Sequence, residues 1–255
     1  MSVDHPLLWH FTFSHYAEKA RWALDWKRIP HVRRRMLPGL HYPRVWLATG
    51  QPTLPVLWLD AHPITDSTRI IAALEQQWPE PPLYPRDERE RRRALELEEF
   101  FDEELGHPLR RVLMQQAFVA ADGAEQGAAF LATGYGPRVR RALRASFPGL
   151  RAFLRWRYDV APATAEASRA KVLAALERIE AEIGPSGYLV GEHFGVADLT
   201  AAALFSPLVQ PPEFPYPYHL TTAAAFRDSL AGRPAFRWLA EMYRRHRGTS
   251  AEVTA

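Results

Sequence analysis

Polar side chains near the start of the chain stand where strands meet helices, and their types suit the binding of a polar ligand. Ser14 follows the apolar run LLWHFTF and precedes the helical pattern SHYAEKARWAL, so its hydroxyl is a natural N-cap at a strand–helix junction. Asp66 and Ser67 open a second helical pattern, and a helix start of this kind attracts anions. A hairpin followed by a capped helix would use Asp66 and Ser67 equally well without any ligand.

A proline stands at the entrance of a predicted strand. Pro55 precedes the apolar run 56–59, where an ordinary central strand would not tolerate it because proline has no N–H. A cis Leu54–Pro55 bond would leave the N–H and C=O of Leu54 free to pair with an extended ligand. The stretch 51–71 therefore predicts a binding wall made of backbone as well as side chains.

The composition excludes several kinds of chemistry. The 255 residues include no cysteine, which excludes disulfides, thiolate metal sites and a cysteine nucleophile, so any thiol must come from a ligand. The net charge is +3, with 29 acidic residues interspersed among 32 basic ones, and we expect no nucleic-acid partner. The ten histidines show no paired metal spacing. We expect a cytoplasmic protein with no membrane partner, because no apolar stretch has the length of a membrane span.

The elements that must position these residues form two parts. Residues 1–78 predict strand, helix, strand, short helical turns, two strands and a helix, which is a small α/β layer. The prolines of WPEPPLYP indicate a semi-rigid boundary, and residues 79–90 are expected to form the linker and the start of a long helix. Residues 91–255 are rich in helix formers at helical spacing and predict an all-α domain.

Three features of the helical part carry specific expectations. Residues 86–116 predict one long helix, bent near the sequence Gly-His-Pro at 106–108. The basic segment 137–158 is interrupted by Pro148-Gly149 and predicts a pair of amphipathic helices studded with arginine, which we favour over an anion-binding or nucleic-acid face. The tail from Gly248 is expected to fray.

This domain order, together with three local strings, resembles the glutathione transferase superfamily. LPVLWLDAHPITDSTRIIAALEQQWP is similar to the family's proline-headed strand and following helix, SHYAEKARWAL to its first helix, and YLVGEHFGVADLTAAAL to its buried helix start. The resemblance implies a thioredoxin-like N-terminal domain that binds glutathione as co-substrate, and a helical C-terminal domain that lines a hydrophobic substrate site. It also implies a homodimer.

The resemblance assigns roles to individual residues of the glutathione site. Leu54 would pair its backbone with the cysteinyl part of glutathione, beside a cis Pro55. Asp66 and Ser67 would hold the γ-glutamyl end, and Gln51 would be a further contact. These assignments turn the stretch 51–71 into the floor and wall of a glutathione site.

The resemblance also places the catalytic group and the second substrate. Ser14 would donate a hydrogen bond to the glutathione thiolate, which lowers the pKa of the thiol without the serine attacking anything itself. Tyr16 offers an alternative hydroxyl. The pocket for the second substrate is expected to include Tyr16, Phe100, Phe101, Glu104, His107 and Arg111.

The expected activity is that of a serine-type glutathione transferase, which conjugates the thiolate to small hydrophobic electrophiles in detoxification. A glutathione-dependent isomerase or lyase is an alternative, as is a transferase-like protein that binds without turnover. Asp198 is expected to be structural, because it stands where the family's buried helix start has an aspartate and would bond the backbone of Gly195.

Overall fold

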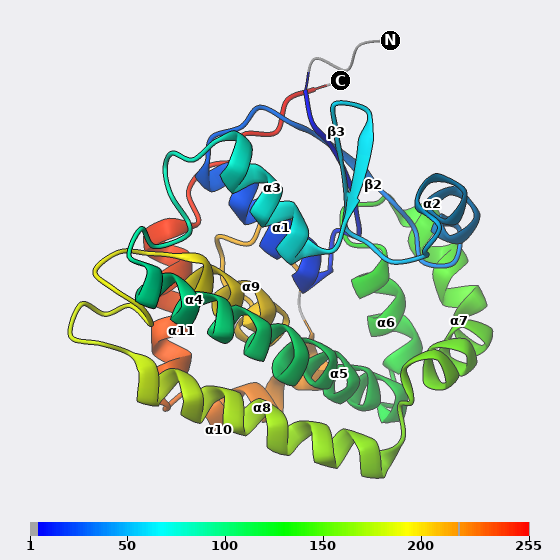
Figure 1. The fold of residues 1–255 in the computed structure, drawn as a ribbon. Helices are drawn as coiled ribbons and strands as arrows, with labels where there is room; N and C mark the ends of the chain where they lie inside the picture. The colour runs from blue at the N-terminus through cyan, green and yellow to red at the C-terminus, as the bar shows by residue number, and fades with distance from the viewer. Residues whose placement is uncertain (1–4, 219, 255) are drawn as a thin grey trace.

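The computed structural model describes residues 5–218 and 220–254, in which a four-stranded sheet and its helices pack on a larger group of helices (Figure 1). The elements, in chain order, are β1 (Leu7–His10), α1 (His15–Trp26), β2 (Val32–Arg35), α2 (His41–Thr49), β3 (Val56–Leu59), β4 (His62–Thr65), α3 (Ser67–Gln77), α4 (Glu88–Phe101), a π-helical turn (Asp102–Gly106), α5 (His107–Val119), α6 (Gly123–Leu131), α7 (Pro137–Tyr158), α8 (Pro162–Glu182), α9 (Val196–Val209), a 3-10 turn (Thr221–Ala223), α10 (Ala224–Leu230) and α11 (Pro234–His246). This is the α/β layer followed by helices that the sequence predicts.

The sheet has the strand order β2-β1-β3-β4, with β1 parallel to β2 and β3 antiparallel to both of its neighbours. Its side chains alternate between two apolar layers. Leu8 and Leu57 pack in the main core under α1 and α3, whereas Trp9 and Val56 pack against Val45 of α2 on the other face (Figure 1). The sheet is therefore covered on both sides, and β2 lies at its edge, as its arginines indicate.

The α2 segment forms a longer helix than the sequence suggests. Pro43 lies in the first turn of α2, where its missing N–H would have no partner in the helix in any case. Gly50 then ends the helix in the left-handed conformation, with φ at 72°. Pro43 and Gly50 therefore mark the beginning and the end of a helix, where the sequence predicted only short helical turns.

The expected long helix is divided by the π-helical turn Asp102–Gly106. The turn ends just before His107 and Pro108, and Pro108 has no N–H to donate to the carbonyl of the residue four positions earlier. The wider turn accommodates that loss and shifts the register of the side chains that precede it. This shift decides which residues of α4 and α5 face the site.

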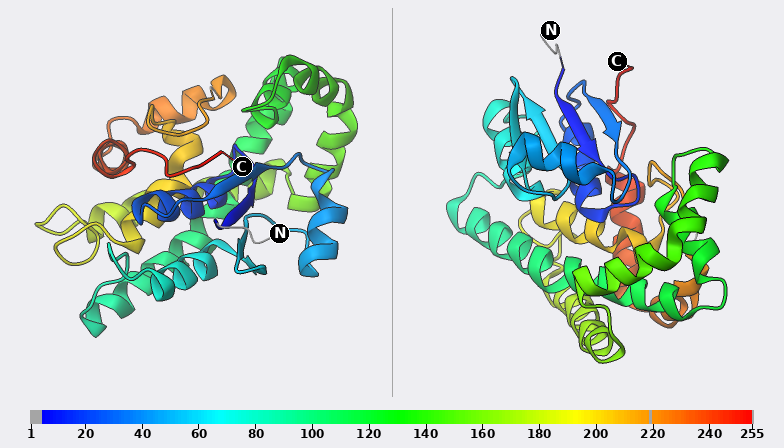
Figure 2. Two further views of the ribbon diagram at one scale, coloured as in Figure 1. Left: turned by 90° about the horizontal axis from the view of Figure 1, so that it is seen from above. Right: turned by 90° about the vertical axis from the view of Figure 1, so that its right-hand side faces the viewer.

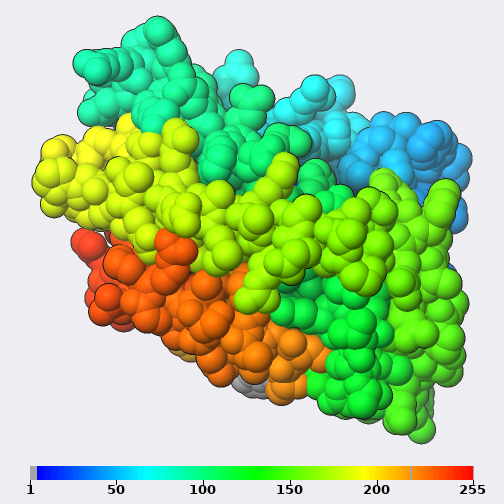
Figure 3. Space-filling view, turned by 90° about the horizontal axis from the view of Figure 1, so that it is seen from below, coloured from blue at the N-terminus to red at the C-terminus, as the bar shows by residue number. Residues whose placement is uncertain are grey.

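Residues 137–158 form one continuous helix, α7, so the expected pair of helices is wrong. Phe147, Leu150 and Leu154 recur at positions i, i+3 and i+7 across Pro148, and they pack together in a separate apolar cluster with Phe118. Burial of this stripe keeps the helix continuous in spite of the proline. Helices α6 and α7 lie below α2 (Figure 1), and the views in Figure 2 show them to one side of the sheet. Helix α8 runs across the lower face of the molecule between α4 and the pair α10 and α11 (Figure 3).

The C-terminal tail is ordered against the edge of the sheet, so the expectation that it frays is wrong. The N–H of His31 donates to the carbonyl of Ala251 at 3.3 Å, and the N–H of Val253 donates to the carbonyl of His31 at 2.9 Å. Inside the tail, the buried carboxylate of Asp25 accepts hydrogen bonds from the N–H of Ala251 and from Arg247, both at 2.8 Å. These long-range partners cannot be seen in the local sequence.

The buried start of α9 follows the sequence prediction. Asp198 accepts hydrogen bonds from the N–H groups of Gly195 and Leu189, each at 2.9 Å. Burial raises the pKa of Asp198 to about 7, against the opposing effect of these two bonds.

In the described part of the chain, none of the helices combines the length and apolar character needed to cross a membrane.

Candidate functional site

Two neighbouring cavities lie between the sheet layer and the helices. The first, of about 520 Å³, is bounded by the β1–α1 turn, the segment before α2, and helices α5, α6 and α7. The second, of about 580 Å³, is bounded by the segment before β3, the start of α3 and one face of α4 and α5. Both cavities are lined by five residues, which mark the place where they meet: Tyr16, Thr53, Leu54, His107 and Arg110.

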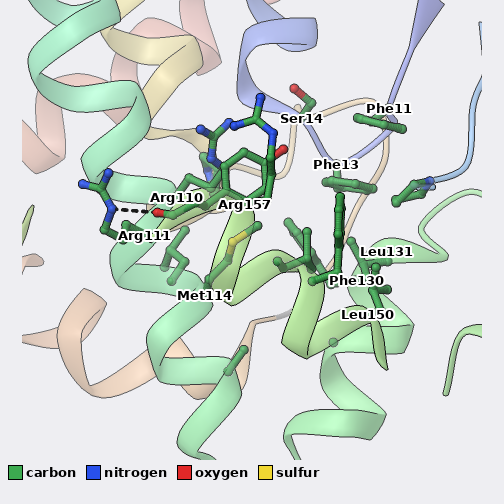
Figure 4. A pocket seen from close by; sticks show the side chains of 18 of the residues that line it. Phe11, Phe13, Ser14, Arg110, Arg111, Met114, Phe130, Leu131, Leu150 and Arg157 are labelled. Atoms are coloured by element: carbon green, nitrogen blue, oxygen red, sulfur yellow. Dashed lines mark hydrogen bonds between the residues drawn. The ribbon is translucent and has the colours of Figure 1, made fainter. Parts of the chain in front are cut away.

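Ser14 lines the first cavity and caps α1. Its Oγ accepts a hydrogen bond from the N–H of Ala17 at 3.2 Å, which fixes the hydroxyl at the helix start. No other described residue receives the hydrogen of this hydroxyl, so it remains available to a ligand. Figure 4 shows Ser14 close to Arg110 and Arg157, with Phe13 and Phe130 along the adjoining wall.

Tyr16 lies at the junction of the two cavities, held by the π-helical turn. Its hydroxyl donates to the carbonyl oxygen of Asp102 at 2.7 Å, and its ring lies beside that of His107, with centroids 5.6 Å apart. Burial and the nearby Asp102 raise the pKa of Tyr16, so the hydroxyl keeps its proton at neutral pH. Since that proton is already donated to a carbonyl, Tyr16 is less suited than Ser14 to bind a thiolate.

The segment before β3 contributes backbone to the second cavity. The Leu54–Pro55 bond is cis, as predicted, and both residues line this cavity. Among the described residues, none forms a hydrogen bond with the N–H or C=O of Leu54. Gln51 lines neither cavity, because its side-chain amide is bonded to the backbone of Thr53. The predicted ligand contact of Gln51 is therefore not supported by its position.

Asp66 and Ser67 lie together at the start of α3 and line the second cavity. The Oδ1 atom of Asp66 accepts hydrogen bonds from the N–H groups of Thr68 at 2.9 Å and Arg69 at 3.1 Å, so Asp66 is the N-cap. The N–H of Ser67 and the second carboxylate oxygen of Asp66 have no hydrogen-bond partner in the described structure. A donor and an acceptor are thus presented side by side.

The opposite wall of the second cavity is acidic. It contains four carboxylates from α4 and the π-helical turn: Glu98, Glu99, Asp102 and Glu103. Lys19 of α1 is fully buried among them and forms ion pairs with Glu98 at 2.8 Å and Asp102 at 2.6 Å. Glu99 and Glu103 have no such partner among the described residues, so this cavity favours a ligand with a cationic group.

Three of the residues expected in the substrate pocket lie elsewhere. Phe101 is buried in the main core, Phe100 packs on that core beneath Arg178, and Glu104 forms an ion pair with Lys171 at 2.7 Å. None of them lines either cavity. The π-helical turn explains these positions, because it rotates the residues before it and within it away from the face that a regular helix would share with His107.

The pocket residues His107 and Arg111 do line the first cavity, and the sequence reasoning missed two arginines beside them. Arg110 and Arg157 line the same cavity. Arg110 has a signal in the sequence, since His107, Arg110 and Met114 recur at positions i, i+3 and i+7 of α5. Arg157 had none, because its place depends on α7 being continuous.

His15 is buried next to the catalytic candidate and is neutral. Burial and the nearby Arg110 lower its pKa to about 3.

Within the described ranges, no three histidine, aspartate or glutamate side chains gather closely enough to hold a metal ion. The functional groups at hand are therefore hydroxyls, carboxylates, guanidiniums and free backbone groups.

Comparisons with known proteins identify the two domains. Residues 8–82 match the family model of the glutathione S-transferase N-terminal domain, and residues 162–241 match that of the C-terminal domain. A search of curated protein sequences gave no match.

Solved structures share the fold at low sequence identity. The β-etherase LigF from Sphingobium sp. strain SYK-6 is 21% identical, with a TM-score of 0.60 over 93% of this chain and 99% of that one. A glutathione S-transferase from Sinorhizobium meliloti is 20% identical, with a TM-score of 0.58 over 97% and 96% of the two chains. One from Methylobacterium radiotolerans, solved in complex with glutathione sulfonate, is 22% identical, with a TM-score of 0.55 over 91% and 92%. With both domain models matched in order and the complete fold shared, the chain belongs to the glutathione S-transferase superfamily.

Proposed function

We propose that this protein is a glutathione transferase that joins the glutathione thiolate to a hydrophobic electrophile. Glutathione would occupy the second cavity and the electrophile the first. The observation that carries the proposal is the meeting of the two cavities at Tyr16 and Leu54, next to the hydroxyl of Ser14. A thiol held along Leu54 would reach this junction.

The groups that line the second cavity suit glutathione. The unpaired N–H and C=O of Leu54 match the backbone of a tripeptide. The free N–H and hydroxyl of Ser67 suit the γ-glutamyl carboxylate, while Asp66, Glu99 and Glu103 suit its ammonium group. Membership of the superfamily and the glutathione sulfonate bound to the Methylobacterium protein support the same ligand.

The proposed chemistry needs a thiolate at neutral pH. The hydroxyl of Ser14 would donate a hydrogen bond to the sulfur, which lowers the thiol pKa and lets the proton leave to water. The thiolate then attacks an electrophilic carbon, a C–S bond forms, and the leaving group departs with the bonding electron pair, or an epoxide oxygen opens and takes a proton from water. Holding both reactants at the junction supplies much of the rate enhancement.

Thermal unfolding with and without glutathione tests the binding half of this proposal. A ligand at 100 times its dissociation constant stabilises the folded state by about 2.7 kcal/mol, so millimolar glutathione should raise the melting temperature by several degrees. An unchanged melting temperature at ten millimolar glutathione would exclude both the transferase and any glutathione-dependent isomerase or lyase.

Mass spectrometry of the products tests the catalytic half. A transferase leaves the glutathionyl group on the product of a halide or epoxide, whereas an isomerase returns free glutathione. A protein that binds glutathione yet turns over none of a panel of electrophiles would be the non-catalytic alternative.

We also propose that the protein is a cytoplasmic homodimer. Several large apolar side chains on α2 and α7 are exposed and would be covered in an assembly: Trp46, Leu47 and Trp156. Light scattering coupled to gel filtration measures the mass directly, and a monomer at micromolar concentration would contradict the proposal.

A further inference from the structure

Among the three described arginines that line the first cavity, Arg110 and Arg157 have no hydrogen-bond partner for their guanidinium groups, and Arg111 is bonded only to neutral groups. Within residues 5–218 and 220–254, neither Arg110 nor Arg157 forms an ion pair or a hydrogen bond through its side chain. Of the residues that line this cavity only Asp159 carries a carboxylate, and Asp159 is paired with neither arginine. A cavity with unpaired cations and almost no acid is complementary to an anion.

A shared aromatic platform holds both guanidiniums. The Cζ atom of Arg110 lies 4.1 Å from the centroid of the Tyr158 ring, and that of Arg157 lies 5.3 Å from the same centroid. Arg111 fixes the platform, because it donates to the carbonyl of Tyr158 and to the hydroxyl of Ser168, each at 3.0 Å. Arg110 lies on α5 and Arg157 on α7, but both contact the same ring, so the fold holds the two side chains together.

Bringing these two arginines together costs free energy in the absence of a ligand. Burial lowers the pKa of Arg110, and repulsion by Arg157 and Arg111 lowers it further. An anion bound between Arg110 and Arg157 would remove this repulsion. Guanidinium groups bind carboxylates through two parallel N–H bonds, which makes a carboxylate the best matched group.

The rest of the cavity lining indicates the chemical character of the rest of the ligand. Away from the arginines the lining is apolar and largely aromatic, and Figure 4 shows Phe13, Phe130 and Leu150 on that side. Phe13 and Phe130 lie against each other, with ring centroids 4.9 Å apart. A ligand that fits both parts has an aromatic or aliphatic body and an acidic group.

We propose that Arg110 and Arg157 bind a carboxylate of the second substrate, so that the substrates of this protein are hydrophobic acids that carry an electrophilic carbon. That the bound acid is a substrate rests on the proposed function. That the two arginines bind an anion follows from the lining of the cavity and does not depend on the proposed function. Arg110 borders both cavities, whereas Arg157 lines only the first, so an anion bound by both arginines would lie in the first cavity.

Binding of a matched acid and amide tests the anion site without any turnover. Phenylbutyrate and phenylbutyramide differ only in the charged group, and their dissociation constants are measured by calorimetry at pH 7 in the absence of glutathione. The wild-type protein should bind the acid about 10- to 100-fold more tightly than the amide, as charge-assisted hydrogen bonds require. Equal affinities for the acid and the amide would overturn the proposal.

Three variants locate the preference. Arg110→Gln and Arg157→Gln should each bring the acid-to-amide ratio close to one. Arg157 is exposed, so this variant keeps its fold even where Arg110→Gln does not. Arg155→Gln is the control, because Arg155 is an exposed arginine of α7 that lines neither cavity, and the ratio should not change. An unchanged ratio in Arg157→Gln, or an equal loss in Arg155→Gln, would show that the inference is wrong.

A competition experiment separates this site from the glutathione site. S-methylglutathione carries both carboxylates of glutathione but no reactive thiol, and it should leave the affinity for phenylbutyrate unchanged. Competitive displacement would assign the arginines to glutathione and overturn the proposal. Failure of glutathione to stabilise the protein overturns the proposed function, while loss of the acid preference overturns only the anion site.

The preference should also appear in turnover. Chloromethylbenzoic acid and chloromethylbenzamide share the same reactive carbon, and we expect KM for the acid to be at least 10-fold lower. Arg157→Gln should raise KM for the acid toward that of the amide, whereas Arg155→Gln should leave both KM values unchanged. A fall in kcat for both substrates would instead place Arg157 in the chemical step and contradict a binding role.

Discussion

The Tyr16 hydroxyl donates a hydrogen bond to the carbonyl oxygen of Asp102 at 2.7 Å, and so joins α1 to the π-helical turn between α4 and α5. The contact is close enough that the last residue of this turn, Gly106, tolerates no side chain. A Cβ atom placed on Gly106 would lie 2.1 Å from the Tyr16 Oη atom. The junction of the two cavities therefore depends on a glycine.

We predict that Gly106→Ala destabilises the protein by about 1–3 kcal/mol, because Tyr16 must move out of its position. Chemical denaturation measures the loss. Gly149→Ala is the matched control, since Gly149 lies inside α7 and a Cβ atom added there would have no other atom within 4 Å. That change should stabilise the protein by about 0.5–1 kcal/mol through helix propensity. If both variants had the same stability, the tight contact at Gly106 would be disproved.

Replacement of Ser14 should separate its capping role from its proposed catalytic role. Ser14→Ala removes both, and we expect about a 100-fold fall in kcat/KM, together with about 1 kcal/mol of lost stability. Ser14→Thr keeps cap and donor and should retain most activity. Ser14→Asp keeps the cap but places a negative charge beside the thiolate, so it should be stable and inactive. Full activity in Ser14→Ala would remove the serine from the mechanism.

The charge of Asp66 should matter more for glutathione than for the fold. Asp66→Asn retains an N-cap and tolerates the positive φ of 74°, but it loses the anion that we propose binds the γ-glutamyl ammonium. We expect glutathione affinity to fall about 10-fold by calorimetry, with stability nearly unchanged. Asp87→Asn is the control, because Asp87 caps α4 through the same pair of bonds, at 3.0 and 2.9 Å, and lines neither cavity. An equal loss in the control would contradict a specific contact.

Buried His15 should make stability depend on pH. Its pKa is lowered from 6.5 to about 3, so between these values the unfolded chain binds a proton that the folded protein does not. Stability is therefore full above pH 6.5 and falls as the pH is lowered toward 3. In His15→Gln this fall should be smaller by about 1.4 kcal/mol per pH unit. Denaturation midpoints between pH 7 and 4 measure it, with exposed His193→Gln as a control that should match the wild type.

Local patterns predicted the sheet layer well because each of its elements carries its own signal. Ser14 and Asp66 both cap the helices that they were expected to cap, and Pro55 has the expected cis bond. The same holds for Asp198, whose two backbone partners lie within ten residues. Short-range hydrogen bonds can be deduced from sequence alone.

Features that depend on distant contacts were predicted poorly. The continuity of α7 through Pro148 follows from burial of Phe147 and Leu154 against another helix. Phe101 and Glu104 lie away from the cavities because a single π-helical turn changes the faces of the residues before it and within it. The lining of the two cavities was therefore predicted where helix caps and backbone form it, and missed where it depends on the register of the helices.

The bonds of Arg247 place a constraint on how this chain is made. Its guanidinium pairs with Glu18 at 2.5 Å and with Asp25 at 2.8 Å, so residues separated by more than 220 positions share one buried charge cluster. During synthesis α1 emerges well before Arg247, and its carboxylates cannot form these pairs until more than 220 further residues have been translated. The charges buried in the sheet layer are thus balanced only after the helical domain has been made.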